Sequence, residues 1–193
     1  AIWKLGIPLI LSNLAQFAIH VTDTVMLGWY SVTALAAATI ATTLQFVVFI
    51  VGAGFSQAVT PLVAVAAEED DEVQVRRVTR MGLWLSIIYG LIVMVPFFWS
   101  EDILIAIGQD RQVAAEAHIY LQIVIWQMIP ALMVMTLKAF LAALEHTAII
   151  LWATIGTAIL NGFINYALIF GNWGFPELGI EGAAIASLSV NLI

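Results

Sequence analysis

One uncharged stretch of the chain decides its fold. Residues 24–67 read TVMLGWYSVTALAAATIATTLQFVVFIVGAGFSQAVTPLVAVAA and contain no acidic or basic side chain. A membrane-spanning helix needs about 20 mainly apolar residues, whereas 44 residues of straight helix would be about 66 Å long. We therefore expect the end of one helix, a turn and a second helix. The predicted turn is at residues 28–31 (GWYS), because glycine interrupts helices and aromatic side chains favour the membrane interface.

The composition of the whole chain points the same way. Of its 193 residues, 63% are hydrophobic and 10% are charged, whereas a soluble domain is about half apolar and about a quarter charged. This composition excludes an ordinary water-soluble globule and a disordered chain. Six basic residues are too few for a phosphate-binding surface, so nucleic acid is not an expected partner. We predict an all-α fold, a polytopic transmembrane helical bundle of about six helices whose surroundings are the lipid bilayer.

Polar segments divide the chain into the expected helices. The predicted connections include residues 68–80, 101–114 and 172–179. Because the sequence begins at Ala1 rather than at methionine and stops inside an apolar run at Ile193, we interpret it as a fragment whose sixth helix is truncated. The predicted helices span residues 5–28, 33–66, 81–100, 115–143, 147–171 and 180–193.

The basic residues predict how the bundle is oriented. Cytoplasmic loops of membrane proteins are enriched in Lys and Arg, and every basic residue except Arg111 is expected on one side. We therefore predict a multi-pass protein of the plasma (inner) membrane with a cytoplasmic N-terminus. Lys138, near the end of the fourth predicted helix, is expected to extend towards the cytoplasmic interface. The residues on this side are Lys4, Arg76, Arg77, Arg80 and Lys138.

Two of the predicted helices carry a polar stripe. Residues three and four positions apart lie on one face of a helix, and the polar residues of the first and fifth helices follow this spacing. We expect these stripes to face protein or water rather than lipid, and their members that do not bind an ion to line a cavity. The first stripe consists of Asn13, Gln16, His20 and Asp23, and the second of Thr154, Thr157, Asn161 and Asn165.

Asp23 is the strongest functional candidate. A charged side chain near the centre of a membrane helix costs about 2.5–3.5 kcal/mol on insertion scales, so it normally has a partner or a function. Asp23 lies five residues before Gly28, about 7.5 Å from the predicted outer end of its helix. That depth suits a cation site open to the outside, or a carboxyl group that carries a proton. The structural alternative is that Asp23 only accepts hydrogen bonds from a neighbouring helix.

Asn161 and Asn165 offer two amide oxygens one helical turn apart. Hard oxygen ligands suit a small hard cation, so a Na⁺ site formed by Asp23, Asn161 and Asn165 is one interpretation. Two amides beside one carboxylate favour Na⁺, with H⁺ as the alternative ion. The structural alternative for the two asparagines is interhelical hydrogen bonding.

The sequence contains no constellation typical of an enzyme. It has no nucleophile–base–acid set, no phosphate-binding glycine loop and no histidine spacing suited to a metal. It also lacks cysteine, which excludes thiolate chemistry and disulfides. We therefore expect neither catalysis nor a cofactor.

Several segments, in this order and at these spacings, resemble the multidrug and toxic-compound extrusion (MATE) family in its bacterial NorM-like branch. The likeness extends over nearly the whole chain. The segments that carry it are residues 22–28 (TDTVMLG), 35–37 (LAA), 60–63 (TPLV), 165–171 (NYALIFG) and 176–184 (PELGIEGAA), with Asn161.

The resemblance implies twelve helices in two six-helix bundles around a central cleft. Residues 1–193 would form the N-terminal transmembrane bundle, and its partner would be the missing C-terminal six-helix lobe. The whole protein would be an antiporter that exports cationic or amphiphilic drugs by alternating access, coupled to Na⁺ or H⁺. Two other readings are open: a lipid-linked saccharide flippase of the same superfamily, and a non-transporting membrane scaffold. The flippase is disfavoured because Lys138 is the only intramembrane basic candidate.

The resemblance also assigns roles to individual residues. The coupling carboxylate of the family's first helix matches Asp23, and polar positions of its fifth helix match Asn161 and Asn165. A hydroxyl of the sixth helix that helps to bind the cation matches Ser187. Some relatives have a second aspartate at the position of Asn165, so this chain departs from a two-carboxylate proton mechanism.

Overall fold

A computed structural model describes residues 2–192 of the chain, with side chains from residue 6 to residue 192. The predictions made for Ala1, Ile193 and the side chain of Lys4 therefore lie outside the described residues. The described residues form helices and turns without a strand, which confirms the all-α prediction. The elements are α1 (Ile2–Tyr30), α2 (Val32–Glu68), α3 (Glu72–Phe97), α4 (Ser100–Ala106), α5 (Arg111–Val124), a 3₁₀ turn (Ile125–Gln127), α6 (Met128–Ala143), α7 (Thr147–Phe170), a second 3₁₀ turn (Asn172–Gly174) and α8 (Ile180–Leu192).

At least four of these segments are long and apolar enough to cross a membrane, and α8 is a shorter apolar helix. Large apolar side chains such as Phe46, Ile50 and Trp84 point outwards, with more than half of their surface exposed. Exposed apolar surface on this scale is typical of a protein surrounded by lipid. The chain is therefore a multi-pass membrane protein. The four spanning segments are Val32–Glu68, Glu72–Phe97, Arg111–Ala143 and Thr147–Phe170.

The long uncharged stretch is divided at Ser31, the last residue of the predicted turn. Ser31 has an extended backbone (φ −161°, ψ 138°), and its hydroxyl accepts a hydrogen bond from the amide of Ala34. This is the standard N-cap arrangement, which satisfies one of the free amides in the first turn of a helix. α1 and α2 are consequently two helices joined by a single residue.

The third helix begins nine residues earlier than predicted, at Glu72 instead of residue 81, and ends at Phe97. Asp71 caps it by accepting a hydrogen bond from the amide of Gln74 at 2.9 Å, and Glu72 forms an ion pair with Arg76 at 2.8 Å, one turn along. These local interactions stabilise the first turns of the helix, and Val75 and Val78, three residues apart, pack them against an apolar cluster with α2 and α6. The predicted connection at 68–80 is therefore almost entirely helical.

The predicted connection at 101–114 is also partly helical. It contains α4, and α5 begins at Arg111, where Asp110 caps it by accepting from the amide of Gln112 at 2.8 Å. The fourth predicted helix is continuous from α5 to α6 except for the 3₁₀ turn at Ile125–Gln127. This turn directly precedes the first turn of α6, which contains Pro130, and a proline ring excludes the normal hydrogen bond to the carbonyl four residues earlier. α7 ends at Phe170, one residue before the predicted end, because Gly171 adopts the left-handed conformation (φ 67°) that closes the helix.

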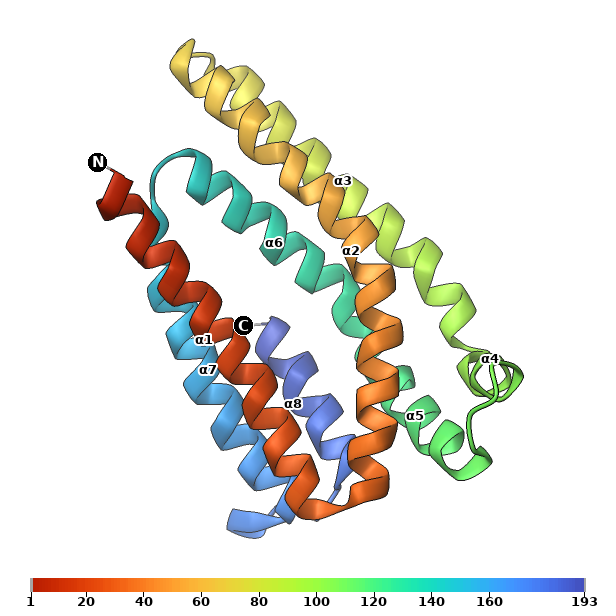
Figure 1. The fold of residues 1–193 in the computed structure, drawn as a ribbon. Helices are drawn as coiled ribbons and strands as arrows, with labels where there is room; N and C mark the ends of the chain where they lie inside the picture. Colours follow the sequence, from red (N-terminus) through yellow and green to blue (C-terminus); the bar gives the residue numbers. More distant parts are fainter. Residues whose placement is uncertain (1, 193) are drawn as a thin grey trace.

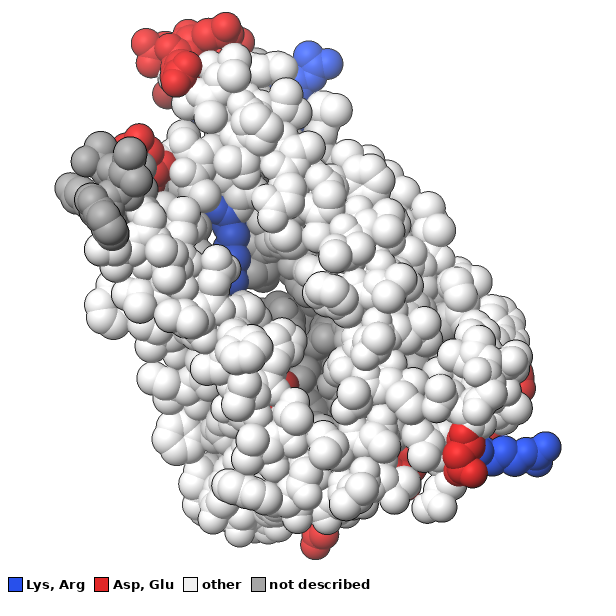
Figure 2. Space-filling model, in the orientation of Figure 1, with Lys and Arg blue, Asp and Glu red and all other residues white. Residues whose placement is uncertain are grey.

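The helices form two groups that meet at one end of the molecule (Figure 1). α1 packs along α7, and α8 packs against α7. On the other side, α2, α3 and α6 pack against one another, and α5 joins the groups by contacting both α2 and α8. Between the groups the surface is hollowed into a groove (Figure 2). We call this hollow between α1 and α6 the central groove.

Close approach between helices depends on small residues. α3 presents Gly82, Ser86 and Gly90 at four-residue spacing towards α6, where Thr136 and Ile129 lie against the two glycines. The Thr136 hydroxyl donates to Ser56 of α2 at 3.0 Å and lies 3.2 Å from the hydroxyl of Ser86. Small residues and hydroxyl hydrogen bonds are the usual means of helix association in lipid, where apolar burial provides little driving force.

Gly182 provides a test of this packing because it holds α8 against the backbone of α7. A Cβ at this position would lie 2.5 Å from the carbonyl oxygen of Leu168. Gly182→Ala should therefore lower the free energy of unfolding by about 1–3 kcal/mol, although alanine is otherwise the better helix former. Thermal unfolding in detergent measures the effect. The matched control is Gly162→Ala on α7, where an added Cβ meets nothing within 4 Å; equal stability of the two variants would contradict this account.

Candidate functional site

Asp23 and the two asparagines of α7 form one hydrogen-bonded cluster. The amide nitrogen of Asn165 donates to a carboxylate oxygen of Asp23 at 2.5 Å and to Oδ1 of Asn161 at 3.1 Å. Both asparagines are completely buried, whereas Asp23 is half-buried. α1 and α7 pack along their lengths, and Asp23 of the first stripe meets Asn165 of the second across this interface. We call these three residues the Asp23 cluster.

The Asp23 cluster has hydrogen-bonding capacity that the described residues do not use. Oδ1 of Asn165 and Nδ2 of Asn161 are buried, and neither has a hydrogen-bond partner among the described residues. Buried polar groups normally find a partner in protein, water or ligand. The carboxylate of Asp23, Oδ1 of Asn161 and Oδ1 of Asn165 are three hard oxygen atoms of the kind that small cations prefer.

Two further helices contribute polar groups beside the cluster. Tyr120 of α5 is 5% exposed and lies within electrostatic range of Asp23, with its hydroxyl close to Ser187 of α8. The predicted residue Ser187 therefore lies near the cluster through Tyr120. Tyr120 was not among the residues predicted for the site. One feature of the sequence pointed to it: Tyr120 is the single tyrosine of the predicted helix at 115–143, and a buried tyrosine hydroxyl usually requires a hydrogen-bond partner.

The remaining members of the first stripe lie further along α1. Asn13, Gln16 and His20 are exposed, so they do not join Asp23 in the buried cluster. Gln16 contacts the opposite side of the central groove, where Nζ of Lys138 donates to its Oε1 at 3.4 Å. Lys138 was expected to extend to the cytoplasmic interface; it reaches across to α1 instead.

The two threonines of the second stripe use their hydroxyl protons within α7. Thr154 donates to the carbonyl of Ile150 at 2.8 Å, and Thr157 donates to that of Ala153 at 2.7 Å. Thr154 is buried and Thr157 is half-buried. Of the second stripe, Asn165 donates across to Asp23 of α1, and Asn161 accepts from Asn165 within α7.

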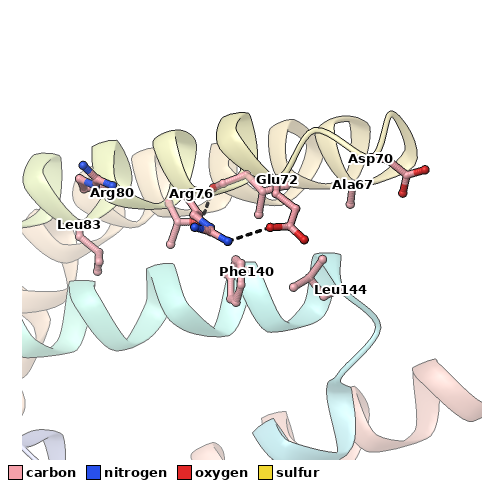
Figure 3. Close-up of a pocket in the computed structure, with 10 residues that line it drawn as sticks. Ala67, Asp70, Glu72, Arg76, Arg80, Leu83, Phe140 and Leu144 are labelled. Atoms are coloured by element: carbon pink, nitrogen blue, oxygen red, sulfur yellow. Dashed lines mark hydrogen bonds and ion pairs between the residues drawn. The ribbon is translucent and has the colours of Figure 1, made fainter.

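A separate cavity lies at the far end of the molecule (Figure 3). It has a volume of about 650 Å³ and lies between the α2–α3 hairpin and the end of α6. Its walls combine the Glu72–Arg76 ion pair and Arg80 with apolar side chains such as Phe140. No member of the Asp23 cluster lines it, so the cavity and the cluster are distinct features.

Within residues 2–192, no three His, Cys, Asp or Glu side chains come together as a metal site. The Asp23 cluster contains one carboxylate and two amides, which is too few charged ligands for a transition metal such as zinc. An ion bound there would be held by oxygen atoms of low total charge.

Comparison with known proteins gives a consistent result. Residues 8–167 match the MatE family. The chain is 47% identical over 189 residues to a protein of Rhizobium meliloti called "Probable multidrug resistance protein NorM", a match that covers 98% of this chain and 40% of that protein. A protein of the same name from Agrobacterium fabrum is 43% identical over 187 residues, covering 97% of this chain and 40% of that protein. The chain thus spans about 40% of the length of these relatives.

Solved structures share the fold at lower sequence identity. A crystal structure of a eukaryotic MATE transporter superposes with a TM-score of 0.91 at 21% identity, covering 98% of this chain and 42% of that one. The outward-facing conformation of a multidrug resistance MATE family transporter gives a TM-score of 0.89 at 18% identity, covering 99% of this chain and 42% of that one. Identities this low establish the common fold alone.

The link between Asp23 and Asn165 can be measured by a double-mutant cycle. Asn165→Leu removes the amide that donates to the carboxylate. The loss in free energy of unfolding that it causes should therefore be smaller when Asp23→Asn has already removed the charge. We expect a coupling of about 1–2 kcal/mol, at the upper end for hydrogen bonds in membrane proteins because one partner is ionisable. Unfolding in mixed detergent micelles provides the four free energies. Thr154→Val is the control, since its hydroxyl bonds within α7, and it should be additive with Asp23→Asn; equal coupling in both cycles would argue against the link.

Proposed function

The chain belongs to the MatE family, and from that membership we propose that it is the N-terminal lobe of a cation-coupled multidrug efflux antiporter. The complete protein exports cationic or amphiphilic compounds by alternating access, driven by Na⁺ or H⁺. The observation that carries the proposal is the Asp23 carboxylate held by Asn165 between α1 and α7. An ionisable group inside a membrane bundle usually belongs to an ion or substrate pathway.

The atoms of the Asp23 cluster support ion binding. Asp23 supplies the charge, and Asn161 and Asn165 supply neutral oxygen atoms, one of which has no partner among the described residues. This set favours Na⁺ as the coupled ion, because hard oxygens of low total charge match a small monovalent cation. A proton on the Asp23 carboxyl group is the alternative, and both ions neutralise the same charge.

Ion binding acts on the packing of α1. α1 packs chiefly along α7, and the hydrogen bond from Asn165 to Asp23 joins the two helices. Neutralising Asp23 weakens this charge-assisted bond and shifts the balance between inward-open and outward-open states. The ion drives transport only to the extent that it binds one state more tightly than the other. The ion enters from outside the cell and promotes release of the drug. It then drives the return of the lobe to its starting conformation.

The arrangement of the helices supports a second lobe. The central groove separates the α1–α7–α8 group from the α2–α3–α6 group (Figure 2), which leaves one face for a C-terminal six-helix lobe to close. The chain spans about 40% of the length of its curated relatives, which leaves room for such a lobe. Drugs would then bind between the two lobes.

The proposed location is the plasma (inner) membrane, with the N-terminus in the cytoplasm. The α2–α3 hairpin carries Arg76, Arg77 and Arg80, and Figure 1 shows the N-terminus at the same end of the molecule as this hairpin. The concentration of arginine at that end supports a cytoplasmic assignment.

The proposal is tested by Asp23→Asn in the full-length protein. This variant keeps the size of the side chain and removes the charge, so ion-driven dye efflux should fall at least tenfold while expression and folding are retained. Efflux is measured in everted vesicles with an imposed Na⁺ gradient at fixed pH and, separately, with an imposed pH gradient. The matched control is Asp102→Asn on α4, an exposed aspartate outside the groove. Efflux unchanged in Asp23→Asn would refute the coupling role.

A further inference from the structure

Lys138 is a half-buried basic side chain without an acidic partner among the described residues. Its nitrogen contacts a neutral atom, Oε1 of Gln16, at 3.4 Å. The ion pair within 4 Å that the described residues form is Arg76–Glu72, in the distant hairpin. A charge inside a membrane protein is costly unless it is paired or serves a ligand. The ammonium of Lys138 is therefore uncompensated in this state of the lobe.

The position of Lys138 places this charge in the central groove. The residue lies five positions before Ala143, the end of α6, which is about 7.5 Å along the helix axis. A lysine at that depth normally extends along its own helix to the near interface. Lys138 instead bridges to α1, a helix that has no extensive packed interface with α6 among the described residues. Its charge thus lies between α6 and α1, the two helices on either side of the central groove.

The central groove has two groups of opposite charge at different levels along α1. Gln16, which marks the level of Lys138, and Asp23 are seven residues apart and lie on the same helix face. Their separation along the axis is about 10 Å, which a drug-sized molecule spans. A positive group therefore lies near the cytoplasmic end of the groove and a negative group lies deeper.

We propose that Lys138 is an anion subsite of the drug-binding groove, which takes the carboxylate of an amphiphile whose aromatic or cationic body lies further along the groove. An anionic oxygen would replace the weak contact with Gln16 by a charge-assisted hydrogen bond, which is about twice as strong as a neutral one. With this subsite, the groove accepts zwitterionic substrates as well as simple cations. This inference rests on the proposed efflux function. It concerns only which substrates are preferred, so the experiment can reject the subsite without rejecting efflux.

The test uses two dyes that share one aromatic cation and differ in one group. Rhodamine 19 carries a free carboxylate, and rhodamine 6G is its ethyl ester. Transport of both is measured with the full-length protein in phosphatidylcholine liposomes. Lys138→Gln should lower kcat/KM for the acid about tenfold or more, the factor expected for one hydrogen bond to a charged group, mainly through KM. It should change kcat/KM for the ester by less than twofold. Lys138→Arg should retain the preference for the acid.

The control removes a positive charge elsewhere in the same lobe. Arg80→Gln in the exposed hairpin should leave the ratio of acid to ester transport unchanged. Equal loss of both dyes in Lys138→Gln would assign Lys138 to packing or to a latch between α6 and α1 and would overturn the subsite. The subsite would also be overturned if Lys138→Gln changed the transport of neither dye. The same holds if the wild-type protein transported the ester but not the acid.

Anionic lipid is the other source of the same chemistry. Repeating the measurement with phosphatidylglycerol added to the liposomes separates the two. The selectivity should already be present in phosphatidylcholine alone; an effect of Lys138→Gln that appears only with phosphatidylglycerol would assign the side chain to lipid headgroups and contradict the proposal. Wild-type protein that moves neither dye down an imposed ion gradient would reject the efflux function itself.

Discussion

The structure depends on keeping one carboxylate inside an apolar bundle. Asp23 would be costly among aliphatic side chains, and the amide of Asn165 compensates by donating a hydrogen bond to it. Because Asn165 also donates to Asn161, the carboxylate fixes the rotation of α7 relative to α1. The tight packing of these two helices and the burial of both asparagines follow from that constraint.

The bundle combines rigid groups of helices with an open groove between them. Within each group, glycine and hydroxyl residues let helices approach closely, as Gly182 does at the backbone of α7 and Gly82 does near Thr136. Between the groups, α5 makes the connection through α2 and α8. Tyr120 of α5 is buried and lies within electrostatic range of Asp23. In the proposed function, a change of charge at Asp23 would therefore act within range of the connection between the two groups.

Charged residues lie at both ends of the lobe and in the central groove (Figure 2). In the α2–α3 hairpin, Glu72 and Arg76 form an ion pair beside a cavity that is remote from the cluster. Asp23 and Lys138 belong to the central groove, with opposite signs and different depths. Exposed ion pairs in water contribute little, whereas isolated charges in the groove interact strongly with whatever enters it. This difference makes the groove, rather than the cavity at the hairpin, the place to look for selectivity.

The sequence by itself determined the class of the protein and the stripe positions from which Asp23 and Asn165 meet in the Asp23 cluster. These features depend on hydropathy and on the 3.6-residue period, which are local properties of the chain. It did not determine the early start of α3, where polar residues outside the membrane form a capped helix. Tertiary structure alone decided that Tyr120 comes within electrostatic range of Asp23 and that Lys138 turns towards Gln16. Those positions depend on which helices become neighbours across the groove, and the period of one helix carries no information about its neighbours.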